Sequence, residues 1–355
     1  MRSPSRPLSA AFVALTATFL ATACAPDTEA GATPQASAAP GPEFGIVIHG
    51  GAGTITRESM TDELEASYHA ALDSALAVGH GILEQGGTAL DAVVAAVRIL
   101  EDEPLFNAGR GAVFTSDGTN ELDAAIMDGA TLNAGAVAGV KSVKNPITLA
   151  RLVMEESPHV FMVGEGAETF GAQHGVETVD ASWFHTEQRW EALQRARESE
   201  GTDVSWHLEE NRMIGTVGAV ARDRNGDLAA ATSTGGMTNK RFGRVGDVPV
   251  IGAGTYASNA SCAVSATGHG EYFIRTVVAR EICARMEYLG ESLQAASEAV
   301  INDRLGVLGG TGGVVAIDRD GHPALYMNTP GMYRGHWMAG GRPFTAIYGD
   351  EGDGR

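Results

Sequence analysis

The chain has 355 residues, 44% of them hydrophobic, and a formal net charge of −19. This apolar content is enough for one large core or two smaller ones, and it excludes a wholly disordered chain. So acidic a chain lacks the basic surface that grips phosphate backbones, which excludes nucleic acid as a partner. The three cysteines, Cys24, Cys262 and Cys283, allow at most one intramolecular disulfide.

The N-terminal segment has the residue order of a secretory signal. Arginines precede an apolar stretch over residues 8–20, and small residues then lead to Cys24. The stretch is too short for a permanent membrane span. We expect residues 1–24 to be a signal peptide with Cys24 lipidated; the alternative is plain cleavage beside Cys24. Residues 25–43 would then be a flexible tether of a periplasmic or cell-surface lipoprotein, which touches the membrane only through its lipid.

The first half of the globular sequence mixes strands and helices. Residues 44–49 predict a short buried strand that the following glycines end. Apolar spacing predicts a helix over residues 61–85, and Thr88 with Asp91 resembles a capping box that opens a second, buried helix. Further strands are predicted over residues 112–115, 122–128 and 134–140, and further helices over residues 146–155 and 186–197.

A polar, acidic segment without periodicity, residues 198–215, separates this half from the next. It is either a surface loop or a flexible, cleavable linker, and its length favours the linker. Two similar hairpins follow, over residues 216–232 and 313–327, each around an Asp- and Gly-containing turn. Helices are predicted between them, over residues 271–289 and 292–305. This order favours a layered α/β sandwich over a βαβ repeat.

Common catalytic motifs are missing from the sequence. The ten histidines show no metal-ligand spacing, no G-x-S-x-G occurs, and no Walker lysine follows the glycine-rich residues 309–313. What remains is a set of threonines beside glycines at predicted strand ends: Thr216, Thr234 and Thr267. Any one of them is more simply an ordinary strand residue beside a turn.

Thr216 has a feature that the others lack, because it directly follows the linker. A threonine hydroxyl is a poor nucleophile unless a base activates it, and its own α-amine can serve as that base. A free α-amine has a pKa of about 7.7–8.0, which suits it to this work near neutral pH. Cleavage of the Gly215–Thr216 bond would create such a residue.

Six motifs, in order along the chain, closely resemble the plant-type L-asparaginase/isoaspartyl peptidase family of N-terminal nucleophile (Ntn) hydrolases. They are HGGAGTI (residues 49–55), NAGRGAVFT (107–115), ELDAAIMDG (121–129), GTVGAVA (215–221), TSTGGMTNKRFGRVGD (232–247) and TGHGE (267–271). The resemblance runs from about residue 44 to the last hairpin and is weakest across the linker.

This resemblance implies an α+β fold, the four-layer αββα sandwich of Ntn hydrolases. It implies a precursor that cleaves itself between Gly215 and Thr216, leaving an α subunit of residues 44–215 and a β subunit of residues 216–355. Two such units would associate as (αβ)2.

The resemblance also implies catalytic roles. Thr216 would be the nucleophile and its freed amine the base, while Thr234 would hydrogen-bond the nucleophile. The Thr267 hydroxyl and the Gly268 N–H would form the oxyanion hole, which suits a glycine-rich turn before a helix.

Further residues would bind the substrate. By motif match, Arg244 would hold its α-carboxylate and Asp247 its α-ammonium, with Gly268 and the Gly270 carbonyl beside them. His269 stands where a smaller residue is familiar, so the polarity near the oxyanion hole differs.

No cofactor is implied for catalysis, but a structural sodium ion is. Its ligands would be main-chain carbonyls, those of Leu100, Glu101, Glu103, Phe106, Ala108 and Arg110. Arg110 replaces a familiar aliphatic residue, although only its carbonyl would bind.

The expected protein is thus a self-processing amidohydrolase that attacks the β-amide of L-asparagine and of β-aspartyl dipeptides. One alternative is a glycosylasparaginase of the same fold, against which HGGAG and residues 238–240 (TNK) argue. The other is a lipoprotein that only binds an amino acid. A gel separates this alternative from the enzymes, because a binder stays a single chain.

Overall fold

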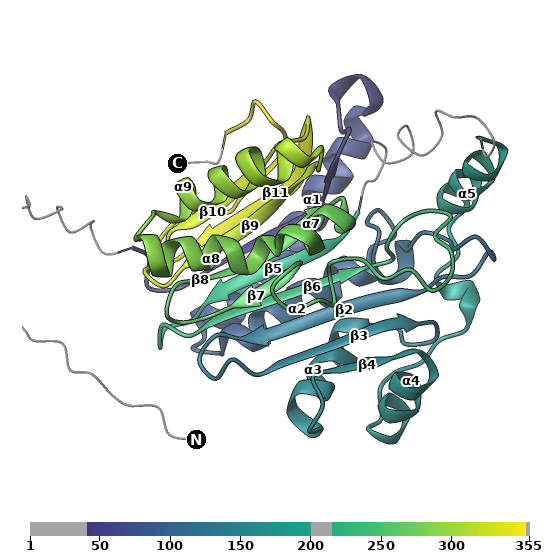
Figure 1. The fold of residues 1–355 in the computed structure, drawn as a ribbon, viewed down its shortest axis with the longest axis horizontal. Coiled ribbons are helices and arrows are strands. Elements are labelled where there is room, and N and C mark those ends of the chain that lie inside the picture. Colours follow the sequence, from purple (N-terminus) through teal and green to yellow (C-terminus); the bar gives the residue numbers. More distant parts are fainter. Residues whose placement is uncertain (1–40, 200–214, 353–355) are drawn as a thin grey trace, which may run out of the picture. The chain divides into compact units, whose positions relative to one another are not determined.

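The computed structural model describes residues 41–199 and 215–352. Within them, two β-sheets stack face to face and helices cover the outer face of each (Figure 1). The predicted αββα sandwich is therefore confirmed. The predicted signal peptide, Cys24, most of the tether and most of the linker lie outside the described residues.

The larger sheet has eight strands, all antiparallel to their neighbours except for the parallel pair at one edge. In spatial order they are β12 (Phe344–Tyr348), β11 (Gly331–Met338), β1 (Gly45–Gly53), β5 (Val217–Arg222), β6 (Leu228–Thr234), β2 (Leu122–Asp128), β3 (Ala134–Val140) and β4 (Phe161–Val163). The smaller, antiparallel sheet contains β10 (Pro323–Met327), β9 (Gly312–Asp318), β8 (Cys262–Gly268) and β7 (Thr255–Ala257). The two predicted hairpins, β5–β6 and β9–β10, thus belong to different sheets.

Helices α1 (Asp62–Glu84), α2 (Ala89–Asp102) and α3 (Pro146–Glu156) pack on the larger sheet, and α8 (Val278–Leu289) and α9 (Leu293–Glu298) pack on the smaller one. The remaining α-helices are α4 (Gly164–Gln173), α5 (Glu187–Ser199) and α7 (Gly270–Thr276). Short 3-10 turns are η1 (Arg57–Ser59), η2 (Gly109–Gly111), η3 (Ala181–Trp183) and η5 (Gly306–Leu308), and η4 (Ala299–Leu305) is a π-helix.

Strand periodicity produces three separate cores between the four layers. In β1, Ile46 and Ile48 join the core under α1 and α2, whereas Val47 joins the core between the sheets. In β9, Val314 faces helices α8 and α9, and Val315 faces the larger sheet. Successive side chains point to opposite faces of a strand, so strands buried on both faces read as continuous apolar runs.

Helix starts were predicted well because their signals are local. Thr61 and Thr88 are the N-caps of α1 and α2, and each side chain accepts a hydrogen bond from a backbone N–H of the first turn. The predicted strands over residues 122–128 and 134–140 are confirmed as β2 and β3.

The expected end of the first strand at its glycines is wrong. β1 continues to Gly53 and pairs with β11, with a bulge between His49 and Gly51. Gly51 has φ +118°, and a Cβ there would lie 2.7 Å from the Gly215 nitrogen. Glycine is required because the chain preceding Thr216 passes directly over this bulge.

Other segments differ from prediction where tertiary contacts decide. Residues 112–115 form only isolated bridges from Phe114 and Thr115. The helix expected over residues 271–289 is broken at Val277, which is left-handed (φ +50°). The helix expected over residues 292–305 passes from α9 into η4.

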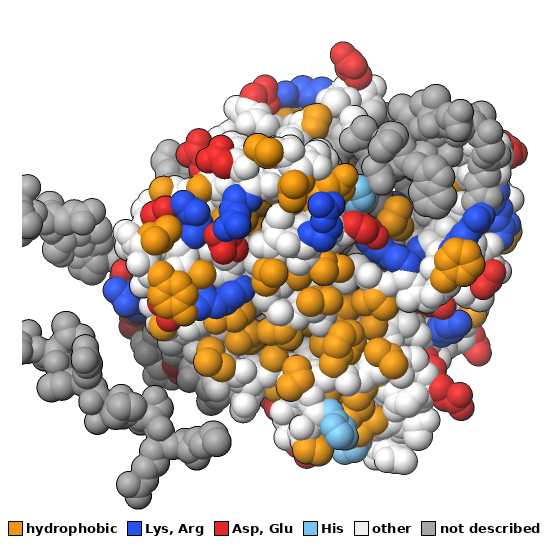
Figure 2. Space-filling view, in the orientation of Figure 1, with side chains coloured by type: hydrophobic (Ala, Val, Ile, Leu, Met, Phe, Trp, Pro, Cys, Tyr) orange, Lys and Arg blue, Asp and Glu red, His pale blue; other side chains and the backbone are white. Residues whose placement is uncertain are grey.

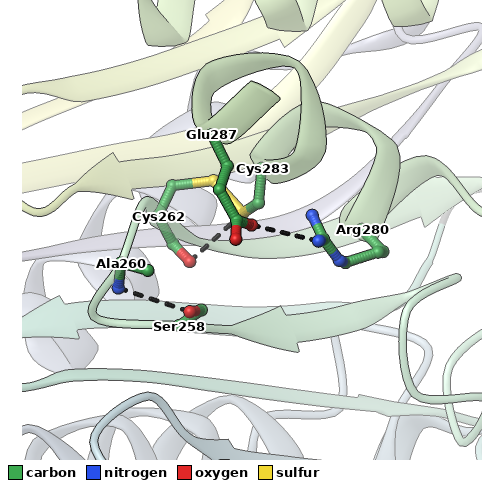
Figure 3. Close-up of a disulfide and its surroundings, with 6 residues drawn as sticks. All are labelled: Ser258, Ala260, Cys262, Arg280, Cys283 and Glu287. Atoms are coloured by element: carbon green, nitrogen blue, oxygen red, sulfur yellow. Dashed lines mark hydrogen bonds and ion pairs between the residues drawn. A yellow bond between two sulfur atoms is a disulfide. The ribbon is translucent and has the colours of Figure 1, made fainter. Parts of the chain in front are cut away.

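One disulfide crosses the outer interface of the smaller sheet. Cys262 at the start of β8 is bonded to Cys283 in α8, with 5.4 Å between their Cα atoms (Figure 3). Both residues are fully buried. The bond ties the second sheet to its covering helix.

Candidate active site

The three predicted threonines meet where the two sheets face each other. Thr216 directly precedes β5 and Thr234 ends β6, and these strands pair with Val217 opposite Ser233. The Thr216 hydroxyl donates a hydrogen bond to Thr234 Oγ1 at 3.0 Å. Thr267 reaches the same place from β8 of the other sheet. All three side chains are buried, so their hydroxyl groups are shielded from bulk water.

Thr267 contacts the bond that precedes Thr216. Its hydroxyl donates to the carbonyl oxygen of Gly215 at 3.4 Å and accepts the backbone N–H of Ala52 at 3.3 Å. The carbonyl is thereby polarised at the atom on which negative charge would develop during attack by a nucleophile. Thr267 therefore lies at the Gly215–Thr216 bond, on the side of its carbonyl oxygen.

The backbone at this bond has an unfavourable conformation. Thr216 has φ +116° and Gly215 has φ +152°. Positive φ is a genuine outlier for a β-branched residue, and such strain is held only where surrounding structure enforces it. Asn107 packs closely against this backbone, since a Cβ on Gly215 would lie 1.9 Å from the Asn107 Cβ.

Asn107 is a site residue that the sequence analysis quoted within a motif without assigning it a role. Its Nδ2 donates to the Gly236 carbonyl at 2.8 Å, and its Oδ1 accepts the Val113 N–H at 3.0 Å. Gly236 N–H donates in turn to Thr234 Oγ1 at 3.0 Å. Asn107 thus connects the backbone around the Gly215–Thr216 bond to Thr234, which accepts the hydrogen bond from Thr216.

His49 is a second such residue. Complete burial lowers its pKa to about 3, against a smaller opposing effect of its hydrogen bond to Thr216, so the imidazole is neutral. The Thr216 carbonyl oxygen, 3.1 Å from Nδ1, can only accept, which places the proton on Nδ1. Nε2 then accepts from Ser265 Oγ at 2.8 Å.

The hydrogen bonds continue behind His49. Thr232 Oγ1 lies 2.7 Å from Ser265 Oγ, and Thr255 Oγ1 donates to Thr232 Oγ1 at 2.7 Å. Because Ser265 donates to His49, Thr232 must donate to Ser265. All the hydroxyl groups in this row therefore donate toward His49. Through His49, this row of hydroxyl groups holds the Thr216 carbonyl in place from the core between the sheets. The residues of the row are distant in sequence, so only the tertiary structure brings them together.

Most of the predicted catalytic and substrate-binding residues line one pocket. Its walls are Ala52, Asn107, Gly215, Thr216, Thr234, Gly236, Met237, Arg244, Gly246, Asp247 and Gly268. Gly270 lies beside it, because a Cβ there would be 2.8 Å from Asp247 Oδ1 and 2.9 Å from Arg244 Nη2. The predicted nucleophile, oxyanion and substrate residues therefore converge on a single place.

The side chain of Asp247 is suited to bind a cationic group. It is buried, and its Oδ2 has no hydrogen-bond partner among the described residues. Burial raises its pKa to about 7, although the nearby Arg244 guanidinium opposes the shift. A buried carboxylate oxygen without a donor is costly, so a positively charged group entering the pocket would be favoured there.

The loop expected to bind sodium folds tightly back on α2. A Cβ on Gly109 would lie 2.3 Å from the Glu101 carbonyl oxygen, and one on Gly111 would lie 2.1 Å from that of Phe106. Two of the predicted carbonyls thus pack against η2. In residues 41–199 and 215–352, no three acidic, histidine or cysteine side chains form a metal-binding group.

The sequence is similar to known proteins along most of its length. Residues 42–347 match the family model described as asparaginase. The isoaspartyl peptidase of Escherichia coli (strain K12) is 56% identical over 312 residues, which are 87% of this chain and 97% of that protein. The isoaspartyl peptidase/L-asparaginase of Homo sapiens is 42% identical over 277 residues (78% and 87%), and the probable isoaspartyl peptidase/L-asparaginase 2 of Arabidopsis thaliana is 40% identical over 313 residues (82% and 95%).

These comparisons overturn the predicted localisation. The relatives from Escherichia coli and Salmonella typhimurium are matched over 97% and 98% of their own lengths, which leaves almost none of either protein to correspond to a leader and tether. The prediction of an exported, lipid-anchored protein is therefore wrong. Among the residues that the structure describes, no helix is both long enough and apolar enough to cross a membrane.

Proposed function

Because the chain belongs to the asparaginase family, we propose that it is a self-processing amidohydrolase that hydrolyses the β-amide of L-asparagine and of β-aspartyl dipeptides. One observation carries the proposal above the others. The Thr216 hydroxyl, held by Thr234, lies next to its own preceding carbonyl, which accepts a hydrogen bond from Thr267. A nucleophile, its partner and an oxyanion donor are thus assembled around the bond to be cleaved.

Self-cleavage begins with attack of Thr216 Oγ1 on the carbonyl carbon of Gly215. The Thr267 hydroxyl stabilises the resulting oxyanion, and the bond from the Gly215 carbon to the Thr216 nitrogen breaks. The proton lost by the hydroxyl ends on that nitrogen, which becomes the free α-amine. Water then hydrolyses the ester between Gly215 and Thr216, and the positive φ of Thr216 no longer has to be maintained.

Turnover of substrate repeats this chemistry with the new N-terminus. The α-amine of Thr216 takes the hydroxyl proton, and the oxygen attacks the side-chain amide of the substrate. The Thr267 hydroxyl and the Gly268 N–H hold the oxyanion. Ammonia or an amino acid leaves with the returned proton, and water resolves the β-aspartyl ester on Thr216.

Two charged residues select the substrate. Arg244 binds the α-carboxylate, and Asp247, whose Oδ2 is buried without a partner among the described residues, binds the α-ammonium. The Gly270 carbonyl contributes a further acceptor. Their proximity around Gly270 suits a small zwitterion better than two unrelated surface charges.

The proposed mature protein consists of an α subunit, residues 44–215, and a β subunit, residues 216–355, associated as (αβ)2. Figure 2 shows hydrophobic side chains gathered over the face where β2, β3 and β7 lie, with charged side chains toward its edges. A surface of this kind is typical of a subunit interface. A sodium ion would be held by main-chain carbonyls at the end of α2 and in the loop that follows it, including those of Glu101 and Phe106, and would stabilise the loop that carries Asn107.

The test is an SDS gel with N-terminal sequencing, followed by assays on the purified protein. The proposal expects two fragments, the smaller beginning at Thr216, and release of ammonia from L-Asn and of aspartate from β-Asp-Leu. A single uncut chain without either activity would refute it, and the same result would favour a protein that only binds an amino acid.

A further inference from the structure

Arg244 is held along one edge by a residue to which the sequence analysis gave no role. Its Nε donates to Glu271 Oε1 at 2.8 Å and its Nη2 donates to Oε2 at 2.9 Å. The two residues come from different segments, the loop after β6 and the first turn of α7. Planar two-bond contacts of this kind fix the orientation of a guanidinium as well as attracting its charge.

This contact leaves the other edge of Arg244 for a ligand. A guanidinium has five N–H donors, and Glu271 engages one on Nε and one on Nη2. Nη1 lies against the pocket wall, because a Cβ would be 2.9 Å from it on Gly246 and 3.4 Å on Gly236. Both glycines line the pocket.

Glu271 is itself held in place. Its Oε2 lies 3.5 Å from His269 Nε2, and the His269 ring packs edge-on against Tyr272 with 4.5 Å between ring centres. Partial burial alone would raise the pKa of Glu271, but the hydrogen bonds and the positive charge of Arg244, together with smaller favourable contacts, lower the pKa and keep the carboxylate ionised. The side chain is 44% exposed, compared with 18% for Arg244.

We propose that Glu271 is a positioning residue for substrate binding, which holds the Nε–Nη2 edge of Arg244 so that its Nη1 side stays turned to the pocket and meets the α-carboxylate. This inference rests on the proposed function. A long arginine side chain otherwise has to be ordered when substrate arrives, and that ordering weakens binding. The competing explanation is an ion pair that merely stabilises the fold.

The chain offers a matched control for this test. Glu291 makes the same contact with Arg285, through Nε at 2.7 Å and Nη2 at 2.6 Å, beyond the end of α8, and neither residue lines the pocket. Glu271→Gln and Glu291→Gln therefore remove equivalent charges, one beside the substrate site and one outside it. Melting temperatures and self-cleavage are compared first, and we expect both variants to fold and mature.

Steady-state hydrolysis of L-Asn and β-Asp-Leu then separates the two explanations. We expect Glu271→Gln to raise KM about tenfold or more, the scale of a charged hydrogen bond, with kcat changed less than about threefold. Glu291→Gln should leave both constants unchanged. Glu271→Asp, which keeps the charge but has a shorter reach, should give an intermediate KM.

A further variant asks whether the effect passes through Arg244. Lysine has a single ammonium group in place of the two guanidinium edges, so Arg244→Lys removes the contact through which Glu271 would act. Adding Glu271→Gln to Arg244→Lys should therefore raise KM by less than about threefold more. An unchanged KM in Glu271→Gln, or a full additional loss in the double variant, would overturn the positioning role while the wild-type activity stands. A wild-type enzyme that hydrolyses neither substrate would overturn the proposed function and this inference with it.

Discussion

The Cys262–Cys283 bond should contribute strongly to the stability of the segment from β8 to α8. The bonded residues are separated by 21 positions, and the ring they close contains Thr267, Gly268 and Glu271. In the loop-entropy model, a cross-link that closes a loop of this length raises the free energy of the unfolded chain by about 3 kcal/mol at 25 °C. For a domain of this size, that loss corresponds to a fall in melting temperature of about 5 °C.

The assay is thermal unfolding of wild type and of Cys262→Ala/Cys283→Ala at equal protein concentration, with and without a thiol reductant. Both sulfurs are buried in the core between β8 and α8, so the reductant should lower the wild-type melting temperature only after prolonged or warm incubation. The double variant should melt lower from the start and respond to reductant no further. Cys24→Ser is the control, because it removes a thiol outside the ring and should retain wild-type behaviour.

Thiol titration in denaturant checks the premise directly. Of the three cysteines, one should react in the oxidised wild type and all three after reduction. Three reactive thiols in unreduced protein, or a double variant that melts within about 1 °C of wild type, would refute the reasoning about the ring.

Four further outcomes concern the site. Thr216→Ala should remain one uncut, inactive chain, and cleavage of that variant at the same bond would exclude Thr216 as nucleophile. Arg244→Ala should reduce kcat/KM by the equivalent of about 2–5 kcal/mol, with partial rescue by Lys; the loss of an ordinary exposed ion pair would cost at most about 1 kcal/mol. Because the pKa of Asp247 is raised to about 7, KM for L-Asn should increase as pH falls through that value. The folded state also binds a proton that the unfolded state has lost between about pH 4 and 7, so Asp247→Asn should melt higher than wild type at pH 8 but not at pH 4. Identical melting curves at pH 8 would contradict the raised pKa.

Sequence alone determined the features whose causes are local. Thr61 and Thr88 cap helices through contacts within one turn, so α1 and α2 were located from their own residues. The hairpin turns likewise follow from their Asp and Gly residues. The three candidate threonines were found because glycines lie beside each of them, and the structure brings Thr216, Thr234 and Thr267 together.

Contacts between distant segments were decided only by the tertiary structure. His49 lies 167 positions from Thr216 and Arg244 lies 27 from Glu271, and nothing in the local pattern of either residue specifies its partner. The glycines of β1 read as a strand end, yet they allow a bulge that pairing with β11 and the approach of Gly215 require. Short strands such as β4 and β7, of three residues each, exist only because a neighbouring strand supplies their hydrogen bonds. Local propensity locates an element and its ends, but the pairing of strands and the burial of charges depend on packing that the whole chain creates.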